Sequence, residues 1–234
     1  SGIPYITHPI SVARTALVEL NLGTNSIMAA LLHDVVEDTD YTIEDIRDAF
    51  GDDVAFLVDV LTKKDSGEYK VSKQIDNFKQ MLDSINYDIR ALLIKLSDRL
   101  HNMRTLGSMR TDKQMKIASE TDYFYAPLAN RLGLYEIKSE LENLSLKFRS
   151  PQEYERIEKK IVSYMKIHEE DIASFIVPIK ESLEKEGIMA RVTARPRSVY
   201  ALWRKMQDTG LNFKELEHVH QIDIVFPYNP EKYT

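Results

Sequence analysis

The sequence contains no cysteine, which excludes disulfide bonds and thiolate metal sites and is compatible with a reducing compartment. It also lacks any apolar run that approaches the roughly 20 residues a membrane-spanning helix requires. No signal peptide is visible near its beginning. We therefore expect a cytoplasmic protein that has no membrane partner.

Basic residues are not in excess, because 31 Lys and Arg stand against 37 Asp and Glu, a net charge of -6. This balance argues against a sequence-independent nucleic-acid binder, and no direct DNA binding is expected, although local basic patches could still bind phosphate. Hydrophobic residues make up 43% of the 234 positions, enough to build a core. Because the sequence begins at Ser1 rather than Met, we expect it to be a fragment of a longer chain.

Hydrophobic periodicity predicts a mainly α fold. Helices are expected over residues 10–20, 25–37, 42–50, 54–61, 73–85, 88–105, 113–132 and 136–148. Thr42 and Asp45 have the spacing of a capping box at a helix start. A helical pattern with a bend at Pro178 runs from 151 to 186, followed by a strand (188–194), a helix (199–206) and a strand (221–226). These elements divide the chain into a helical domain (1–150), a helical connector (151–187) and the start of an α/β domain (188–234).

Residues 31–38, LLHDVVED, place four ionisable side chains in a segment that follows the apolar run of residues 27–32. On one continuous helix Asp34 would face Glu37 and Asp38, because residues three and four apart share a face. A helix with this much apolar surface is mostly buried, and buried charges need partners. The alternative is a helix end with a solvated acidic turn, but a His-Asp pair followed one turn later by Glu-Asp favours a metal site.

Two further side chains could complete such a site. His8 stands at a predicted helix entry, and Asp98 follows an apolar run in KLSDRLHNMRT, residues 95–105. One divalent ion could then be held by His8, His33, Asp34 and Asp98. A shell of imidazole and carboxylate without thiolate suits Mn, Fe, Zn or Ni and leans away from structural zinc. Such an ion lowers the pKa of bound water and polarises a phosphoryl oxygen.

Glu37 and Asp38 lie one turn from these ligands, where they could orient the water or exchange its proton. Taken singly, His8 is more simply a capping or core histidine, and Asp98 is more simply a surface carboxylate paired with Arg99 or Lys95. Positive charge suited to a phosphorylated substrate comes from Lys63, Lys64, Lys95, Arg99 and Arg104. Solvated helix faces explain Lys64 and Lys95 at least as well.

Three segments in this order resemble the HD-superfamily hydrolase domain of the RelA/SpoT family of stringent-response enzymes. They are YITHP at residues 5–9, HDVVED at 33–38 and LSDRLHNMRT at 96–105. Residues 125–148 also resemble that family, and residues 195–206 resemble the start of its (p)ppGpp synthetase domain. The resemblance covers nearly the whole chain and implies an HD-superfamily helical domain, a helical connector and the start of an α/β synthetase-like domain.

The resemblance implies a Mn²⁺-dependent 3′-pyrophosphohydrolase of the bacterial cytoplasm. It would convert guanosine tetra- or pentaphosphate, (p)ppGpp, to GDP or GTP and pyrophosphate. By position, the metal ligands are His8, His33, Asp34 and Asp98, and the catalytic acidic pair is Glu37 and Asp38. The substrate pocket is assigned to Ser1, Tyr5, Asn102 and Thr105, with Arg99 and Lys63 added for their charge. A homo-oligomer is compatible with the resemblance, and ribosome association is expected only through regions outside this sequence.

Two departures from the family pattern bear on activity. The Arg-Lys pair expected immediately before the opening Ser-Gly is absent from the sequence. The synthetase-like segment keeps Arg195, Arg197 and Ser198 but lacks the later acidic and Tyr-bearing strands, so we predict no synthetase activity from these residues. Two other functions remain open, an HD phosphohydrolase acting on another nucleotide and a regulatory module that binds nucleotide without turnover.

Overall fold

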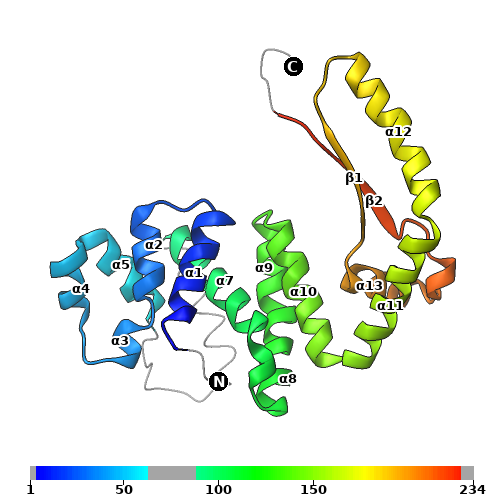
Figure 1. Ribbon diagram of the computed structural model, residues 1–234. Coiled ribbons are helices and arrows are strands. Elements are labelled where there is room, and N and C mark those ends of the chain that lie inside the picture. The colour runs from blue at the N-terminus through cyan, green and yellow to red at the C-terminus, as the bar shows by residue number, and fades with distance from the viewer. Residues whose placement is uncertain (1–3, 63–87, 228–234) are drawn as a thin grey trace. The chain divides into compact units, whose positions relative to one another are not determined.

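The computed structural model describes residues 4–62 and 88–227, and Figure 1 shows a chain built mainly of helices. The predicted mainly α fold is confirmed. Contacts divide the chain into two compact units, residues 1–145 and 146–234. The helix predicted over residues 73–85 lies outside the described residues, as do Ser1 and Lys63.

The described part of the first unit is built from helices. They are α1 (Thr7–Val18), α2 (Thr24–Leu32), α3 (Val35–Asp38), α4 (Ile43–Phe50), α5 (Asp52–Leu61), α7 (Ile89–Arg104), α8 (Thr111–Glu120), the π-helix η2 (Thr121–Tyr125), α9 (Ala126–Arg131) and most of α10 (Tyr135–Arg149). A short 3₁₀ turn, η1 (Leu106–Ser108), follows α7.

Small side chains pack in the core shared by α1, α2 and α7. Ala16 of α1, Ala29 and Ala30 of α2 and Ala91 of α7 are fully buried in one hydrophobic cluster. Helix axes approach more closely where the contacting side chains are small, and α1 contacts both α2 and α7. This packing brings the beginning of α1, the end of α2 and the middle of α7 to one region, which is where the candidate site lies.

The helix boundaries of α4 follow the predicted capping chemistry. The side chain of Thr42 accepts a hydrogen bond from the amide of Asp45, and the Asp45 side chain accepts one from the amide of Thr42. The predicted capping box is therefore confirmed. Gly51 lies between α4 and α5 with a φ of +89°, a conformation that glycine adopts without the steric cost of a Cβ.

Two predicted boundaries around the site were wrong. The helix α1 already begins at Thr7, so His8 lies inside its first turn rather than before it. The predicted helix over residues 25–37 is interrupted, since α2 ends at Leu32 and α3 begins at Val35. The interruption has a local cause. Nδ1 of His33 donates a hydrogen bond to the carbonyl oxygen of Ala30, and in a continued helix that oxygen would accept from the backbone N–H of Asp34.

The helix predicted over residues 113–132 contains a wider π turn between α8 and α9. Pro127 has no amide hydrogen, so the carbonyl of Tyr123 loses its ordinary helical donor. The hydroxyl of Thr121 also donates to the carbonyl of Ile117 at 2.8 Å. Both features favour a local departure from regular α geometry at this point.

The second unit combines two long helices with a small sheet. Its elements are α11 (Pro151–Ile167), α12 (Glu169–Lys185), β1 (Arg191–Pro196), α13 (Val199–Thr209), the 3₁₀ turn η3 (Phe213–Glu215) and β2 (His220–Val225). The strands pair antiparallel, with Val192 opposite Ile224. Contacts of α11 with α13 and of α12 with β1 group the predicted connector with this unit, and the three-part division of the chain stays a prediction.

The helical segment predicted over residues 151–186 is divided into two helices, and the bend predicted at Pro178 stays a prediction. The break in the helical segment lies at His168, between α11 and α12, and α12 continues through Pro178. Three acidic residues, Glu169 to Asp171, form the first turn of α12. Negative charge stabilises a helix N-terminus, which favours a new helix start at this place.

Arg90, at the start of α7, links that helix to α5. Its guanidinium lies 2.6 Å from Asp53 and 2.7 Å from Asp88, and hydrogen bonds from Arg90 and Asn25 lower the pKa of Asp53 to about 2. A carboxyl group with a lowered folded-state pKa stabilises the fold above its unfolded pKa, and this contribution is lost as pH falls through the folded value. We expect Arg90→Met to lower the free energy of unfolding by about 1 kcal/mol at neutral pH, because the pair is partly exposed.

The difference between Arg90→Met and wild type should shrink as pH falls from about 4 to about 2, the interval between the unfolded and folded pKa values of Asp53. Thermal unfolding of both proteins across that interval measures it. Arg110→Met is the matched control, since the Arg110 side chain is 83% exposed. A stability difference that stayed constant with pH would contradict the assigned role of Arg90.

None of the helices in residues 4–62 and 88–227 combines the length and apolar character that a membrane crossing requires.

Candidate metal centre

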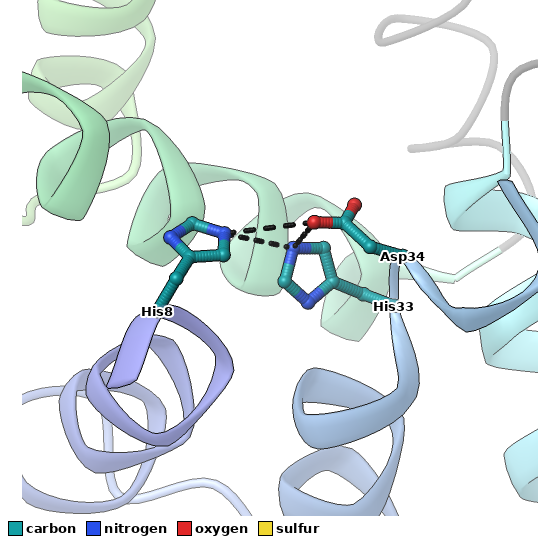
Figure 2. Close-up of side chains that lie close together, drawn as sticks. All are labelled: His8, His33 and Asp34. Carbon is teal, nitrogen blue, oxygen red and sulfur yellow. Dashed lines mark hydrogen bonds and ion pairs between the residues drawn. The ribbon is translucent and has the colours of Figure 1, made fainter. Parts of the chain in front are cut away.

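Four side chains converge where α1, the turn between α2 and α3, and α7 meet. His8 lies in the first turn of α1, His33 and Asp34 form the turn, and Asp98 lies in α7. Figure 2 shows His8, His33 and Asp34 pointing toward one another from two separate segments. We call these four residues the His–Asp cluster, and they are the residues that the sequence predicted as metal ligands.

The donor atoms of the His–Asp cluster lie close together. Nε2 of His33 is 3.2 Å from Oδ2 of Asp34, and Nε2 of His8 is 3.6 Å from the same oxygen. The two Nε2 atoms are 3.4 Å apart. Oδ1 of Asp98 closes the group from α7, at 3.4 Å from Nε2 of His8 and 3.9 Å from Nε2 of His33.

These distances fit a shared cation. His8, His33 and Asp34 each offer a ligand atom within 4.8 Å of the others. Ligand atoms about 2.1 Å from one ion lie roughly 3.0–3.4 Å apart at octahedral or tetrahedral angles, close to the spacing found here. Two imidazoles and two carboxylates are also a donor set that divalent first-row metals accept. The residues present therefore fit a divalent metal ion.

The orientation of His33 is fixed from outside the cluster. The side chain is 1% exposed, and its Nδ1 donates to the carbonyl oxygen of Ala30 at 2.7 Å. The proton of the neutral ring then resides on Nδ1, which leaves the lone pair of Nε2 facing Asp34 and His8. A hydrogen bond to a backbone carbonyl is the usual way in which a metal-binding histidine is held in the ligating tautomer.

The electrostatics of the cluster favour positive charge. Burial alone would lower the pKa of His33, but the hydrogen bond to Asp34 and the charges of Asp98 and Asp34 outweigh it and raise that pKa. Burial would raise the pKa of Asp98, but the hydrogen bond to His8 and the charges of Lys95 and His33 lower it. The pKa of Asp34 is likewise held low against burial by the hydrogen bond and charge of His33. A site that stabilises ionised carboxylates beside imidazoles also attracts a divalent cation.

Two residues assigned to the substrate pocket touch the carboxylates of the cluster. The hydroxyl of Tyr5 donates to Oδ2 of Asp34 at 2.5 Å and lies 3.2 Å from Oδ2 of Asp38. The amide of Asn102 donates to Oδ1 of Asp98 at 2.7 Å. Burial, reinforced by the hydrogen bond to Asp34, raises the pKa of Tyr5, which keeps this hydroxyl protonated as a donor.

The predicted acidic pair lies on α3, directly after the cluster. The amides of Glu37 and Asp38 both donate to the carbonyl oxygen of Asp34, at 3.1 and 2.9 Å. Both residues are exposed. Both residues therefore lie within one turn of a candidate ligand, and their backbone amides are bonded to the carbonyl of that ligand.

Other predicted pocket residues have different surroundings. Arg99 is adjacent to Asp98 in sequence, but its guanidinium pairs with Glu120 at 3.5 Å and stacks 4.1 Å from the ring centre of Tyr125. The hydroxyl of Thr105 donates to the carbonyl of His101 at the end of α7. The structure does not bring the guanidinium of Arg99 into the His–Asp cluster, and Ser1 and Lys63 lie outside the described residues.

Reasoning from the sequence gave no role to His101, although this histidine lies within the segment that contains Asp98. Its Nδ1 is 2.8 Å from Nδ1 of His8. Burial, together with the charge of His8, lowers the pKa of His101. The signal available in the sequence was the spacing, because His101 follows Asp98 by three residues on one helix and therefore shares its face.

Comparison with known proteins identifies relatives of this chain. A protein from Haemophilus influenzae named guanosine-3′,5′-bis(diphosphate) 3′-pyrophosphohydrolase is 43% identical over 228 residues, 96% of this chain and 33% of that protein. The Escherichia coli bifunctional (p)ppGpp synthase/hydrolase SpoT is 40% identical over 227 residues, 96% of this chain and 32% of that protein. A Myxococcus xanthus protein named GTP pyrophosphokinase is 41% identical over 238 residues, covering 100% of this chain and 31% of that protein.

The chain spans about a third of the length of these relatives. The model of the HD domain family matches residues 1–135, more than half of the chain. That range contains every residue of the His–Asp cluster and the acidic pair after it. The chain therefore belongs to the HD domain family.

Proposed function

We propose that the chain hydrolyses the 3′-pyrophosphate of (p)ppGpp in a Mn²⁺-dependent reaction of the bacterial stringent response. The observation that carries this proposal is the convergence of the His–Asp cluster beside Glu37 and Asp38. The substrate is suggested by the names of relatives that are 40–43% identical over 96% of the chain. Manganese is suggested by the mixed imidazole and carboxylate donors, which also suit Fe, Zn or Ni.

The chemistry divides between a bound ion and the residues around it. When bound, a divalent ion supplies a water of lowered pKa and positive charge against phosphoryl oxygens. In the hydrolysis a water molecule would add to the phosphorus bonded to the ribose 3′ oxygen, the P–O3′ bond would break, and the 3′ oxygen would take up a proton. The products are GDP or GTP and pyrophosphate.

The residues of this chain have separate roles in that reaction. His8, His33, Asp34 and Asp98 would hold the ion. Glu37 or Asp38 accepts the proton that the attacking water loses, a role for which an exposed carboxylate beside the cluster is suited. Lys95, whose charge acts on Asp98, contributes positive charge against the departing pyrophosphate.

Pyrophosphate release from ppGpp by this chain tests the proposal. We expect release when Mn²⁺ is supplied and none when the ion is removed with a chelator. Parallel reactions with GDP, GTP and dGTP separate the proposal from an HD phosphohydrolase that acts on another nucleotide, since only ppGpp carries the 3′-pyrophosphate. Turnover of those other nucleotides without turnover of ppGpp would contradict the proposed substrate.

A nucleotide-sensing module is the alternative from another class. It predicts binding of ppGpp by calorimetry without pyrophosphate release, even with Mn²⁺ present. One relative is named GTP pyrophosphokinase, so the same preparation is also assayed with ATP and GTP. We expect no (p)ppGpp synthesis from residues 1–234, and its detection would contradict that expectation.

A further inference from the structure

The two histidines of the His–Asp cluster are held in different ways. His33 donates from Nδ1 to the backbone carbonyl of Ala30, as described above. Nδ1 of His8 instead faces a side chain, Nδ1 of His101, at 2.8 Å. The two rings lie with their centres 4.8 Å apart and are inclined by 56°, so the contact is edge-on between nitrogens rather than a parallel stack.

Proton placement in this pair is constrained by the distance. Two ring nitrogens 2.8 Å apart are within hydrogen-bond distance, and such a bond needs one N–H and one lone pair. His8 can offer the lone pair of Nε2 to an ion only if its own proton resides on Nδ1. His101 must then accept at Nδ1 and carry its proton on Nε2.

We infer that His101 is a positioning residue that holds His8 in the ligating tautomer and ring orientation through the Nδ1–Nδ1 hydrogen bond. The inference rests on the proposed metal site and adds a residue that does not itself contact the ion. The inference also assigns two functional residues to α7. The same helix supplies Asp98 as a ligand and, one turn later, the acceptor that orients the ligand from α1.

Two substitutions separate hydrogen bonding from packing. His101→Asn keeps an acceptor oxygen near the place of Nδ1, whereas His101→Phe keeps a ring and removes the acceptor. Loss of an outer hydrogen-bond partner of a metal ligand typically weakens metal binding by about 10- to 100-fold. We expect that loss of Mn²⁺ affinity for His101→Phe, and a change of less than about 3-fold for His101→Asn.

Binding is measured without turnover, by titrating Mn²⁺ into metal-free protein and following the electron paramagnetic resonance signal of free Mn²⁺. His168→Phe serves as the matched control, because the side chain of His168 is 41% exposed and lies in the second unit. Thermal unfolding of the metal-free variants checks that they fold, and His101→Ala replaces His101→Phe if the latter does not.

The possible results are distinct. Wild-type affinity in His101→Phe or His101→Ala would overturn the inference, while the metal site would stand. Equal weakening in His101→Asn and His101→Phe would also overturn it, since the imidazole would then act by packing alone. Failure of the wild-type protein to bind Mn²⁺ would overturn the metal site first, and with it the role of His101.

Discussion

Asp98→Asn is expected to abolish the proposed metal-dependent hydrolysis of ppGpp while the helices remain folded. The carboxylate of Asp98 lies within 3.4 Å of Nε2 of His8 and 3.9 Å of Nε2 of His33, so it faces both imidazole donors. Asparagine keeps the shape and removes the negative charge that the ion would neutralise. Losing even an outer partner of a ligand costs about 10- to 100-fold, so losing a ligand should reduce kcat/KM by more than about 100-fold.

The measurement is pyrophosphate release by Asp98→Asn in saturating Mn²⁺, together with circular dichroism and a Mn²⁺ titration. Asp88→Asn is the matched control, because Asp88 is a carboxylate at the start of the same helix and its partner is Arg90. We expect that control to change stability and to leave hydrolysis intact. Wild-type turnover by Asp98→Asn would remove Asp98 from the ligand set.

Glu37→Gln and Asp38→Asn are expected to separate catalysis from metal binding. These exposed carboxylates follow the His–Asp cluster on α3, and Oδ2 of Asp38 is 3.2 Å from the hydroxyl of Tyr5. A general acid or base typically contributes about 10²- to 10⁴-fold to a rate. We therefore expect kcat to fall by that range in at least one of the two variants, with Mn²⁺ affinity retained within about 3-fold.

Single-turnover assays and Mn²⁺ titration of each variant provide the two readouts. Glu44→Gln is the control, since Glu44 is an exposed acidic residue in the first turn of the next helix and pairs only loosely with Arg47 at 3.3 Å. Unchanged turnover in both test variants would exclude the acidic pair from proton transfer. A large loss of Mn²⁺ affinity would instead make the pair part of the metal shell.

The residue types of the candidate site could be predicted from the sequence, because few kinds of functional site combine histidine and carboxylate side chains at this spacing. His33 and Asp34 with an acidic pair three and four residues later indicate a metal site, and His8 and Asp98 complete the donor set. Their convergence depends on packing among three segments up to 90 residues apart, which no local pattern contains. The alanines of α1, α2 and α7 favour close packing, but they do not by themselves specify which helices meet.

Two errors in the predicted fold are helix interruptions, which hydrophobic periodicity does not register. Hydrophobic periodicity continues through residues 25–37 and 151–186, whereas the helices are interrupted at His33 and at His168. At His33 the interruption arises from a hydrogen bond between a side chain and the backbone, which periodicity does not register. His101 was overlooked for a related reason, because its partner His8 lies 93 residues away and only the folded chain brings the two rings together.

In the turn between α2 and α3, a continuous helix and a pair of neighbouring metal ligands would require different backbone conformations. Successive residues on an uninterrupted α-helix are rotated by about 100°, so neighbouring side chains diverge. His33 and Asp34 are neighbours, yet their donor atoms lie 3.2 Å apart in the turn that separates α2 from α3. A substitution that strengthened helical structure across these two residues would make the local backbone more regular and would draw the two donors apart. At this position the pair of neighbouring donors coincides with an interruption between two helices.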